Sequence, residues 1–478
     1  MKYQIEAKSY GAYDVVVCGG GTAGCMAAIA AAREGANTLL IERSFVVGGM
    51  LTVGEAGITK FSEHCKDVDR YKKEVIDVLA SDPKSVQVAG GIAHEYVMRM
   101  ISDGKAVGTH GDAGSYVFTD KAESQWVLMQ MLEEAGVEVM YDTRVCLVKK
   151  DEDKVCGVVV CNKEGFLEIE AKQTIDTTGD ADVAALAGVP FNKGAVESDV
   201  NEGCAKRVGE MQGIGCMYRV KGVDFEKLFA HLKADPTFFH QHEFGPMSLD
   251  DVMESYARGD MCVFRVHLKE CSPSLKSDLV QIYNLPAKDE AILLGPGCGY
   301  LGDGLDARSL STAHFKIHKG AHELTEAMKR YPGFENAEVL YVPDAGVRET
   351  RHIIGEHVLS VIDVLSGKDF EDSIACGGHP LDIHPLPPEV ENVDLNHWRF
   401  HIPYGVLLPK NTENLLVAGR AISATRGASG ATRPTVQCMA MGEAVGVAAA
   451  MAAQSGMTPK QIDVQVLRRR LVEKGCII

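Results

Sequence analysis

The segment Val15–Arg43, VVVCGGGTAGCMAAIAAAREGANTLLIER, joins an apolar strand, a glycine cluster and a helix of small residues. Gly19, Gly21 and Gly24 fit the pattern G-x-G-x-x-G. In this motif the first glycine makes a tight turn, the second lets the backbone approach a pyrophosphate, and the third allows close helix–strand contact. We therefore predict a dinucleotide site at the start of this helix, with Thr22 and Ala23 in the binding turn.

The continuation of this segment supports the same interpretation. Thr38–Ile41 is predicted to be a second strand, and Glu42 follows it, 18 positions after Gly24. An acid at about this distance accepts hydrogen bonds from a ribose and disfavours a 2′-phosphate, which argues against NADP. The motif alone does not distinguish FAD from NAD, and a glycine-rich turn without a ligand is the alternative.

The overall composition limits the classes of function. The chain has 478 residues and a formal net charge of −17, with 46% hydrophobic residues. This length favours two domains, and the negative charge argues against a nucleic-acid partner. There is no uninterrupted apolar run of 18 residues and no signal-peptide pattern at the start, so we expect no membrane association and a cytoplasmic location. The 14 cysteines contain no C-x-x-C pair, which argues against a ferredoxin-type cluster.

The distribution of patterns along the chain predicts an interrupted domain. Residues 68–80, 92–102 and 120–135 have helical patterns, and residues 137–176 predict an antiparallel meander that ends in "IDTTGD". Residues 415–418 and 435–455 return to the buried strand and small-residue helix of the beginning. We predict that residues 1–195 and 403–478 form one discontinuous domain and that residues 196–402 form an inserted α+β domain.

Three segments carry a resemblance to a known family: "GGGTAG" followed by Glu42, "IDTTGD" in the middle, and "NLLVAGR" near the end. Together they resemble the glutathione-reductase-type FAD fold, an α/β Rossmann-like domain. More narrowly, the chain resembles FAD-dependent oxidoreductases related to fumarate reductase flavoprotein subunits and to GidA and thiazole-synthase flavoproteins. "VRETRHIIGE" at Val347–Glu356 and "DIH" at Asp382–His384 are similar to a bacterial group within them.

The resemblance implies how FAD would be held. The first glycine cluster would cradle the pyrophosphate, Glu42 would bind the adenosine ribose, and the start of the helix at Thr435 would face the flavin. The other residues expected at the cofactor are Arg43, Gly48, Gly49, Met50, Thr52, Val145, Thr178, Gly179, Gly419 and Arg420. The chain has "SFVV" where covalent relatives carry a flavin-linking histidine, so non-covalent FAD is expected. It also has Arg426 where many relatives have a histidine, so a role borrowed from that histidine is not expected.

Flavin chemistry through N5 requires residues that place a substrate and handle a proton. We predict that Arg348 binds or polarises the substrate and that His401 or Tyr404 handles the proton. If "VRETRHI" were helical, Arg351 would share a face with Arg348. The structural alternative is that Arg348 pairs with Glu349 or Glu356.

Histidine patterns elsewhere are not expected to bind metal. His314, His318 and His322 are spaced as on one helix face, but the outer two would be about 12 Å apart along the axis. A solvated face is therefore predicted for these three, His240 and His242 are predicted to lie in a loop, and no metal is expected.

The sequence thus predicts an FAD-dependent oxidoreductase that dehydrogenates or ene-reduces a small polar substrate. It leaves open the substrate, the direction, the external electron donor or acceptor and a homo-oligomeric state. A GidA-like flavoprotein acting on RNA and a non-catalytic FAD-bound protein are the alternatives. The acidic charge speaks against RNA. A thiazole-synthase-like enzyme would need a much shorter chain.

Overall fold

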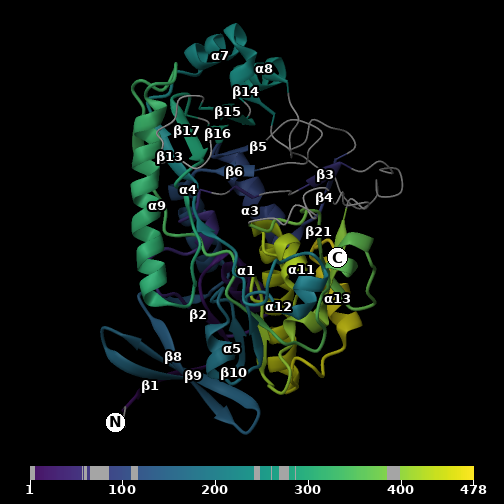
Figure 1. Cartoon of the computed structure of the whole chain (residues 1–478). Helices are drawn as coiled ribbons and strands as arrows, with labels where there is room; N and C mark the ends of the chain where they lie inside the picture. Colours follow the sequence, from purple (N-terminus) through teal and green to yellow (C-terminus); the bar gives the residue numbers. More distant parts are fainter. Residues whose placement is uncertain are drawn as a thin grey trace.

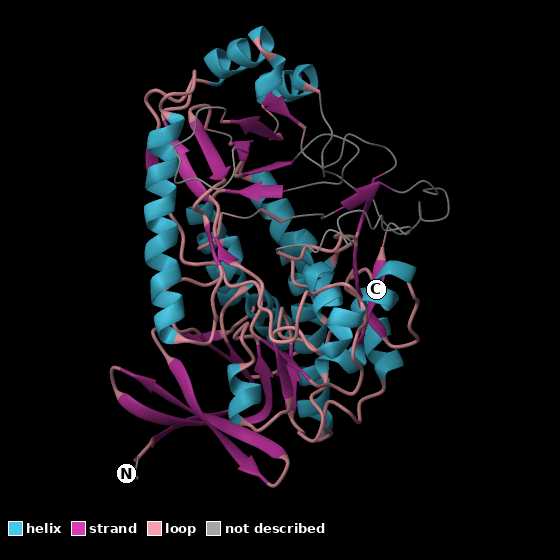
Figure 2. Cartoon of the chain, in the orientation of Figure 1, coloured by secondary structure: helices cyan, strands magenta, loops and turns pink. Residues whose placement is uncertain are grey.

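The computed structural model describes residues 6–55, 57–58, 62–64, 85–108, 117–241, 248–259, 261–268, 279–285, 287–384 and 399–478. Two sheets lie toward opposite ends of the molecule, with helices between and around them (Figures 1 and 2). The helix expected at 68–80, and His242, lie outside the described residues.

The first sheet has seven strands in the order β7-β2-β1-β10-β9-β8, with β23 also paired to β10. Its parallel part is buried on both faces: Val15–Cys18 of β1 and all of β2 are apolar, and the end of β10 is buried although it carries polar residues. The meander expected from the sequence is present as β8, β9 and β10. The strands are β1 (Lys8–Cys18), β2 (Thr38–Ile41), β7 (Glu138–Met140), β8 (Arg144–Asp151), β9 (Lys154–Asn162), β10 (Gly165–Asp176) and β23 (Leu415–Val417).

Two helices far apart in sequence, α1 (Thr22–Arg33) and α12 (Thr435–Ser455), pack together over this sheet. Their contact requires glycine: a Cβ at Gly442 would lie 2.2 Å from the Ala23 oxygen, and one at Gly446 would lie 2.3 Å from the Ala27 oxygen. Among the described residues, α12 could span a membrane by length and composition, but 89% of its apolar window is buried inside the protein. The first and last parts of the chain therefore share one core.

Further helices surround this core. The prediction for 92–102 is confirmed by α3, and that for 120–135 by α4, which begins after Asp120, whose side chain accepts a hydrogen bond from the Glu123 amide. The helices are α3 (Gly91–Ser102), α4 (Lys121–Glu134), α5 (Asp182–Leu186), α6 (Glu197–Asn201), α10 (Val361–Ser366), α11 (Arg426–Thr432) and α13 (Val464–Glu473).

The second sheet lies in the chain between β10 and β23 and is antiparallel, in the order β14-β15-β16-β17-β13-β19. Its strands are β13 (Tyr218–Lys221), β14 (Phe239–His240), β15 (Val263–His267), β16 (Leu279–Asn284), β17 (Glu290–Leu294) and β19 (Glu338–Tyr341). Helices α7 (Phe225–Ala234), α8 (Leu249–Arg258) and α9 (Ala307–Met328) accompany it. Figure 1 shows α9 running along one side of the molecule from this sheet toward the first.

Short strand pairs and 3₁₀ turns complete the fold. They are β3 (Ser62–His64) with β4 (Ser85–Gln87), β5 (Ala106–Gly108) with β6 (Val117–Thr119), β11 (Phe191–Lys193) with β20 (Arg351–Ile353), β12 (Ile214–Gly215) with β18 (Gly299–Tyr300), β21 (Ser373–Gly377) with β22 (Phe400–Pro403), and η1 (Gly49–Leu51), η2 (Pro236–Phe238) and η3 (Tyr404–Leu407).

The hydrophobic cores bear on the domain boundaries. The core of the second sheet draws on residues 218–337, whereas Leu359, Ile374, Ile383 and Phe400 belong to the core beneath α1 and α12. The assignment of 196–402 to one inserted domain stays a prediction, and the packing of 359–402 favours a narrower one.

Candidate functional site

The first glycine cluster forms a turn that only glycine fits. Gly19 has φ +105°, and a Cβ there would lie 2.6 Å from the Thr177 oxygen. A Cβ at Gly24 would lie 1.8 Å from the Gly19 oxygen, so the helix touches the turn directly. A Cβ at Gly21, in contrast, would meet no described atom within 4 Å, so the N-terminus of α1 has open space beside its backbone. This is the arrangement that a phosphate needs at a helix start.

The second glycine doublet lies against the first cluster. Gly48 and Gly49 both have positive φ, and a Cβ at Gly49 would lie 3.0 Å from the Gly21 Cα. The Thr22 hydroxyl donates a hydrogen bond to the Gly48 oxygen at 2.9 Å. The two loops therefore run backbone to backbone at the start of α1.

Glu42 connects β2 to this turn. Its Oε2 accepts a hydrogen bond from the Gly20 amide at 2.8 Å, and its Oε1 accepts from the Ser44 amide and hydroxyl, each at 2.8 Å. The side chain is buried. Its position at the end of β2 suits a ribose contact, which stays a prediction.

Three parallel strands end at the same edge of the sheet and place their glycine turns together. β1 leads to Gly19, β10 leads to Gly179 and β23 leads to Gly419. In open α/β sheets, ligands bind in the crevice outside the carboxyl ends of such strands. We call the turns at Gly19–Gly24, Gly48–Gly49, Gly179 and Gly419 the glycine edge.

An ion pair lies beside Gly179 at the glycine edge. Asp180 Oδ1 accepts from the Arg420 guanidinium at 2.5 Å and from the Thr350 hydroxyl at 2.8 Å. Although burial opposes ionisation, Arg420 holds the pKa of Asp180 below its usual value, with a smaller effect of Arg43. Gly179 is required here because its Cβ would lie 3.2 Å from the Arg420 Cζ. The Arg420 Nε is buried without a partner in the described part of the chain.

The remaining predicted cofactor residues lie on the surrounding elements. Thr178 donates to Asp176 Oδ1 at 2.7 Å through its hydroxyl, and the Thr52 hydroxyl donates to the Val47 oxygen at 2.6 Å. Met50 is exposed in η1, Val145 lies on β8 opposite Val160, and the buried Thr435 begins α12. These positions do not by themselves test their contact with a cofactor.

Arg348 lies in a loop between β19 and β20. It does not make the ion pair that the structural alternative expects. Its Nη1 donates to the Gly213 oxygen at 2.7 Å, and no carboxylate in the described part of the chain lies within ion-pair distance. The pairing with Glu349 or Glu356 is wrong, because Glu349 contacts Arg426 at 3.1 Å and Glu356 contacts Lys460 at 2.7 Å. Burial, followed by the neighbouring Arg433, lowers the pKa of Arg348 to about 10.

The expected pairing of Arg348 with Arg351 on a helix face is also wrong. Residues 351–353 form strand β20, and Arg351 donates to the Asp180 oxygen at 2.7 Å and to Asp182 Oδ1 at 2.9 Å. The second arginine near Arg348 is instead Arg433, which lies two residues before α12. The sequence signal that could have found it is Arg433-Pro434 at the predicted helix start.

Arg433 belongs to a polar group that the chain assembles from separate segments. Its Nη2 donates to Asp382 Oδ2 at 2.6 Å, and Asp382 Oδ1 contacts His384 Nε2. Although burial opposes ionisation, Arg433 and then His384 hold the pKa of Asp382 well below its usual range. We call Arg348, Asp382, His384 and Arg433 the Arg348 cluster. It joins two arginines to one carboxylate beside the first turn of α12.

The two predicted proton-handling residues lie elsewhere. The Tyr404 hydroxyl donates to the Pro459 oxygen at 3.0 Å, and burial raises the pKa of Tyr404. His401, on β22, has its Nδ1 3.4 Å from the Ser373 hydroxyl and 3.6 Å from Cys376 Sγ. Burial, followed by the nearby Arg399, lowers the pKa of His401. Their catalytic roles stay predictions, and Tyr404 has its only hydroxyl proton bound to backbone.

Arg426, which stands where many relatives have a histidine, is buried and hydrogen-bonded inside the protein. It is 1% exposed, its amide donates to Asp199 Oδ1 at 2.8 Å, and its Nη1 donates to the Glu210 oxygen at 2.5 Å. Together with the Glu349 contact, these bonds fix α11 to the segment that precedes the second sheet.

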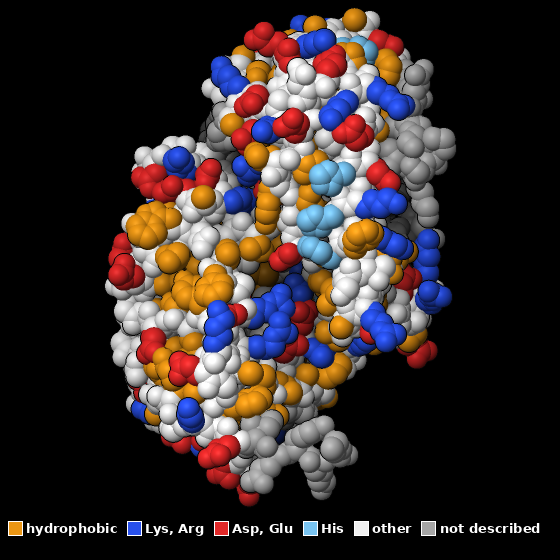
Figure 3. Space-filling model, turned by 90° about the vertical axis from the view of Figure 1, so that its left-hand side faces the viewer, with side chains coloured by type: hydrophobic (Ala, Val, Ile, Leu, Met, Phe, Trp, Pro, Cys, Tyr) orange, Lys and Arg blue, Asp and Glu red, His pale blue; other side chains and the backbone are white. Residues whose placement is uncertain are grey.

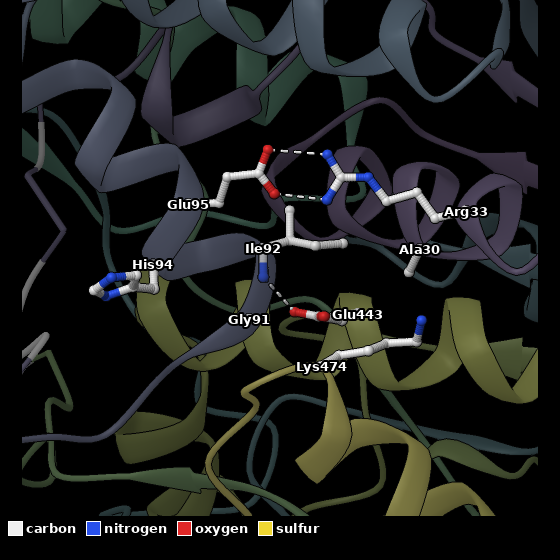
Figure 4. Close-up of a pocket in the computed structure, with 8 residues that line it drawn as sticks. All are labelled: Ala30, Arg33, Gly91, Ile92, His94, Glu95, Glu443 and Lys474. Carbon is white, nitrogen blue, oxygen red and sulfur yellow. Dashed lines mark hydrogen bonds and ion pairs between the residues drawn. The ribbon is translucent and has the colours of Figure 1, made fainter. Parts of the chain in front are cut away.

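A separate cavity of about 350 Å³ lies between α1, α3 and α12 (Figure 4). Glu443 lies at its base and accepts a hydrogen bond from the Ile92 amide at 2.8 Å, which caps α3. Arg33 and Glu95 pair across its rim at 2.6 Å. Arg33 and Glu95 pair with each other and Glu443 accepts from backbone, so we treat this cavity as a junction between helices and not as a candidate site for catalysis.

On α9, His314 and His322 are exposed, whereas His318 is partly buried and its Nε2 has no hydrogen-bond partner in the described part of the chain. Figure 3 shows a face of the molecule on which histidines gather beside a hollow with Lys and Arg side chains. The rings of His314 and His318 are 4.4 Å apart. In the described ranges, no three His, Cys, Asp or Glu side chains are placed to hold a metal ion.

Comparisons with known proteins place this geometry in a family. The family model described as FAD dependent oxidoreductase matches residues 14–471. Digeranylgeranylglycerophospholipid reductase 2 of Methanopyrus kandleri is 27% identical over 229 residues, 48% of this chain and 49% of that protein. NADH:fumarate oxidoreductase of Klebsiella pneumoniae is 27% identical over 202 residues, 35% of this chain and 20% of that protein. The chain thus spans half or less of these relatives.

Among solved structures, a geranylgeranyl bacteriochlorophyll reductase-like protein from Thermoplasma acidophilum is 14% identical, covers 97% of this chain and 84% of its own, and has a TM-score of 0.42. The expected relation to FAD-dependent oxidoreductases, with a Rossmann-like mixed sheet, is confirmed. The narrower likeness to GidA flavoproteins is not supported, since the similar relatives include geranylgeranyl reductases instead.

The residues at the glycine edge fit FAD. Gly21 leaves room at a helix start for the pyrophosphate, and the orphaned Arg420 Nε beside Gly179 is a buried donor without a partner among described residues. FAD supplies hydride transfer when bound, and the protein positions it and the substrate.

Proposed function

The chain belongs to the FAD dependent oxidoreductase family, whose model covers residues 14–471, and we propose that it transfers a hydride to or from a small polar organic substrate held at the Arg348 cluster. The cofactor is FAD, and we propose that it is bound non-covalently at the glycine edge. The substrate then lies between the first turn of α12 and the second sheet.

One observation carries this proposal. Arg348 is a partly buried guanidinium near a second arginine, Arg433, and it has no carboxylate within ion-pair distance among the described residues, although Asp382 attracts it from further away. Two neighbouring guanidinium groups repel each other, and a bound anionic or strongly polar group would relieve that cost. The planar guanidinium can also hold a carboxylate through two parallel hydrogen bonds.

An anaerobic substrate screen can determine the direction of the reaction. Relatives named as reductases support testing ene-reduction alongside dehydrogenation. Oxidised protein is mixed anaerobically with 2-hydroxy acids and amino acids while flavin bleaching is followed. Photoreduced protein is mixed with α,β-unsaturated carboxylates while reoxidation is followed.

The cofactor part has its own test. Acid precipitation of the purified protein should release the yellow chromophore into the supernatant. Colour that stays with the pellet would contradict non-covalent binding, and a protein without flavin would contradict the proposal as a whole.

A further inference from the structure

We propose that His384, oriented by Asp382, is the residue that exchanges a proton with the substrate. This inference rests on the proposed function and gives a role to His384, the last residue of the "DIH" segment, to which the sequence analysis attached none. The observations are the contact of His384 with Asp382, its exposure, and its connection to Arg348.

Hydrogen bonds to its side chain and backbone hold Asp382 in place. Its Oδ2 accepts from Arg433 at 2.6 Å, its backbone oxygen accepts from the same Nη2 at 2.9 Å, and its amide donates to the Gly430 oxygen at 3.3 Å. A Cβ at Gly430 would lie 3.1 Å from the Asp382 amide nitrogen, so α11 packs directly on this segment. The carboxylate therefore has one oxygen, Oδ1, directed to His384 Nε2.

The backbone of His384 is joined to Arg348 through one glycine. The Gly213 amide donates to the His384 oxygen at 3.0 Å, and the Gly213 oxygen accepts from Arg348 Nη1 at 2.7 Å. The His384 amide is 3.3 Å from Gln212 Oε1, to which it donates. The His384 backbone is therefore two hydrogen bonds away from the Arg348 guanidinium.

The exposure of His384 suits proton exchange. Its side chain is 50% exposed, whereas that of His401 is 11% exposed and Tyr404 is 4% exposed with its hydroxyl bound to backbone. A residue that exchanges a proton with the substrate in every catalytic cycle must afterwards release that proton to solvent or regain one from it. A half-exposed ring can do so. The charged and titratable groups that act on its partner Asp382 are Arg433, His384 itself and His379.

The contact also sets which nitrogen reacts. Because Asp382 accepts a proton from Nε2, the neutral ring presents Nδ1 as an acceptor, as an aspartate fixes the tautomer in other dyads. In dehydrogenation, the O–H or N–H bond of the substrate would break and its proton would move to Nδ1, while bound FAD would accept the hydride from the adjacent carbon. In ene-reduction, reduced FAD would supply a hydride to one carbon of the double bond, and the imidazolium would give its Nδ1 proton to the other carbon. The Asp382 carboxylate balances the imidazolium charge in both directions.

The test compares FAD-loaded His384→Gln and Asp382→Asn with His322→Gln, a matched change of an exposed histidine on α9. The first measurement is imidazole ¹⁵N NMR of the oxidised protein, with the His384 signals assigned by their loss in His384→Gln. We expect a proton on Nε2 and none on Nδ1, and a mixture of tautomers in Asp382→Asn. A neutral ring protonated on Nδ1 would overturn the inference.

The second measurement is the rate of flavin reduction or reoxidation with the compounds of the preceding section. We expect about a 100-fold or larger loss for His384→Gln, a loss of about tenfold for Asp382→Asn, and no change for His322→Gln. A wild-type rate in His384→Gln would overturn the inference. If no compound reacts with the wild type, the proposed substrate class fails, and the NMR result still decides whether the dyad exists.

Discussion

The glycine edge and the Arg348 cluster lie on the same molecule but are constructed in opposite ways. At the glycine edge, backbone touches backbone and side chains are absent by necessity, as at Gly24 beside the Gly19 oxygen. At the Arg348 cluster, long charged side chains from a loop, the 380–384 segment and the end of α11 converge. If the proposed function holds, the comparison teaches that main-chain shape would hold the cofactor, whereas substrate choice would depend on a few replaceable side chains.

The strongest way to break this contrast is to add volume at the glycine edge. Gly24→Val places a Cβ 1.8 Å from the Gly19 oxygen, so either the turn or the helix must move. We expect the loss of several kcal/mol of stability, beyond the usual cost of overpacking of about 1–3 kcal/mol, and no retained FAD. The measurements are the melting temperature and the ratio of flavin to protein. Gly136→Ala is the matched control, because a Cβ there meets no described atom within 4 Å, although its φ of +76° will cost some stability.

At the Arg348 cluster the same comparison predicts loss of turnover with an intact fold. Arg348→Lys keeps the charge but loses the planar fork, so the rate with any compound that reacts should fall about 100-fold or more while FAD content stays constant. Arg351→Lys, in the same motif but directed at Asp182, should instead leave that rate within a few-fold. A lower melting temperature with an unchanged rate in Arg348→Lys would make Arg348 structural.

The ion pair behind Gly179 tests whether side chains also matter at the glycine edge. Asp180→Asn removes the charge-assisted bond from Arg420, worth roughly 1.5–3 kcal/mol, and should weaken FAD retention. Because the folded pKa of Asp180 lies below its unfolded value, this stabilisation is present above the unfolded pKa and is lost as the pH falls through the folded pKa. Urea unfolding at pH 7 and pH 3 measures it. Asp182→Asn, at a half-exposed pair, should change little.

The smallest expected effect concerns the cavity away from both regions. Burial raises the pKa of Glu443, so its ionisation costs stability as the pH rises through that folded value. Glu443→Gln keeps an acceptor for the Ile92 amide and should be as stable as wild type at low pH and more stable, by about 1 kcal/mol or less, at pH 8. Equal pH dependence of unfolding in both proteins would show that this carboxyl does not titrate as described.

The two regions also differ in how far the sequence predicts them. The first turn of the glycine edge follows from local rules, because the strand, the turn at Gly19–Gly24 and the helix are adjacent in the chain, and β2 and α12 have the bounds expected. The Arg348 cluster does not, because its three segments, at Arg348, at Asp382 with His384, and at Arg433, are 34 to 85 positions apart and only tertiary packing unites them. The helical spacing of Arg348 and Arg351 misled because residues 351–353 pair with β11, and strand pairing turns them away from Arg348.

The measurement that tests the central claim most directly is a crystal structure of the FAD-bound protein. The account predicts the pyrophosphate at the open side of Gly21 and the Arg348 guanidinium beside the isoalloxazine, close enough to share a substrate, with hydrogen bonds of roughly 3 Å. FAD bound elsewhere, or an Arg348 guanidinium more than about 10 Å from the isoalloxazine, a separation far beyond hydrogen-bond reach, would contradict it.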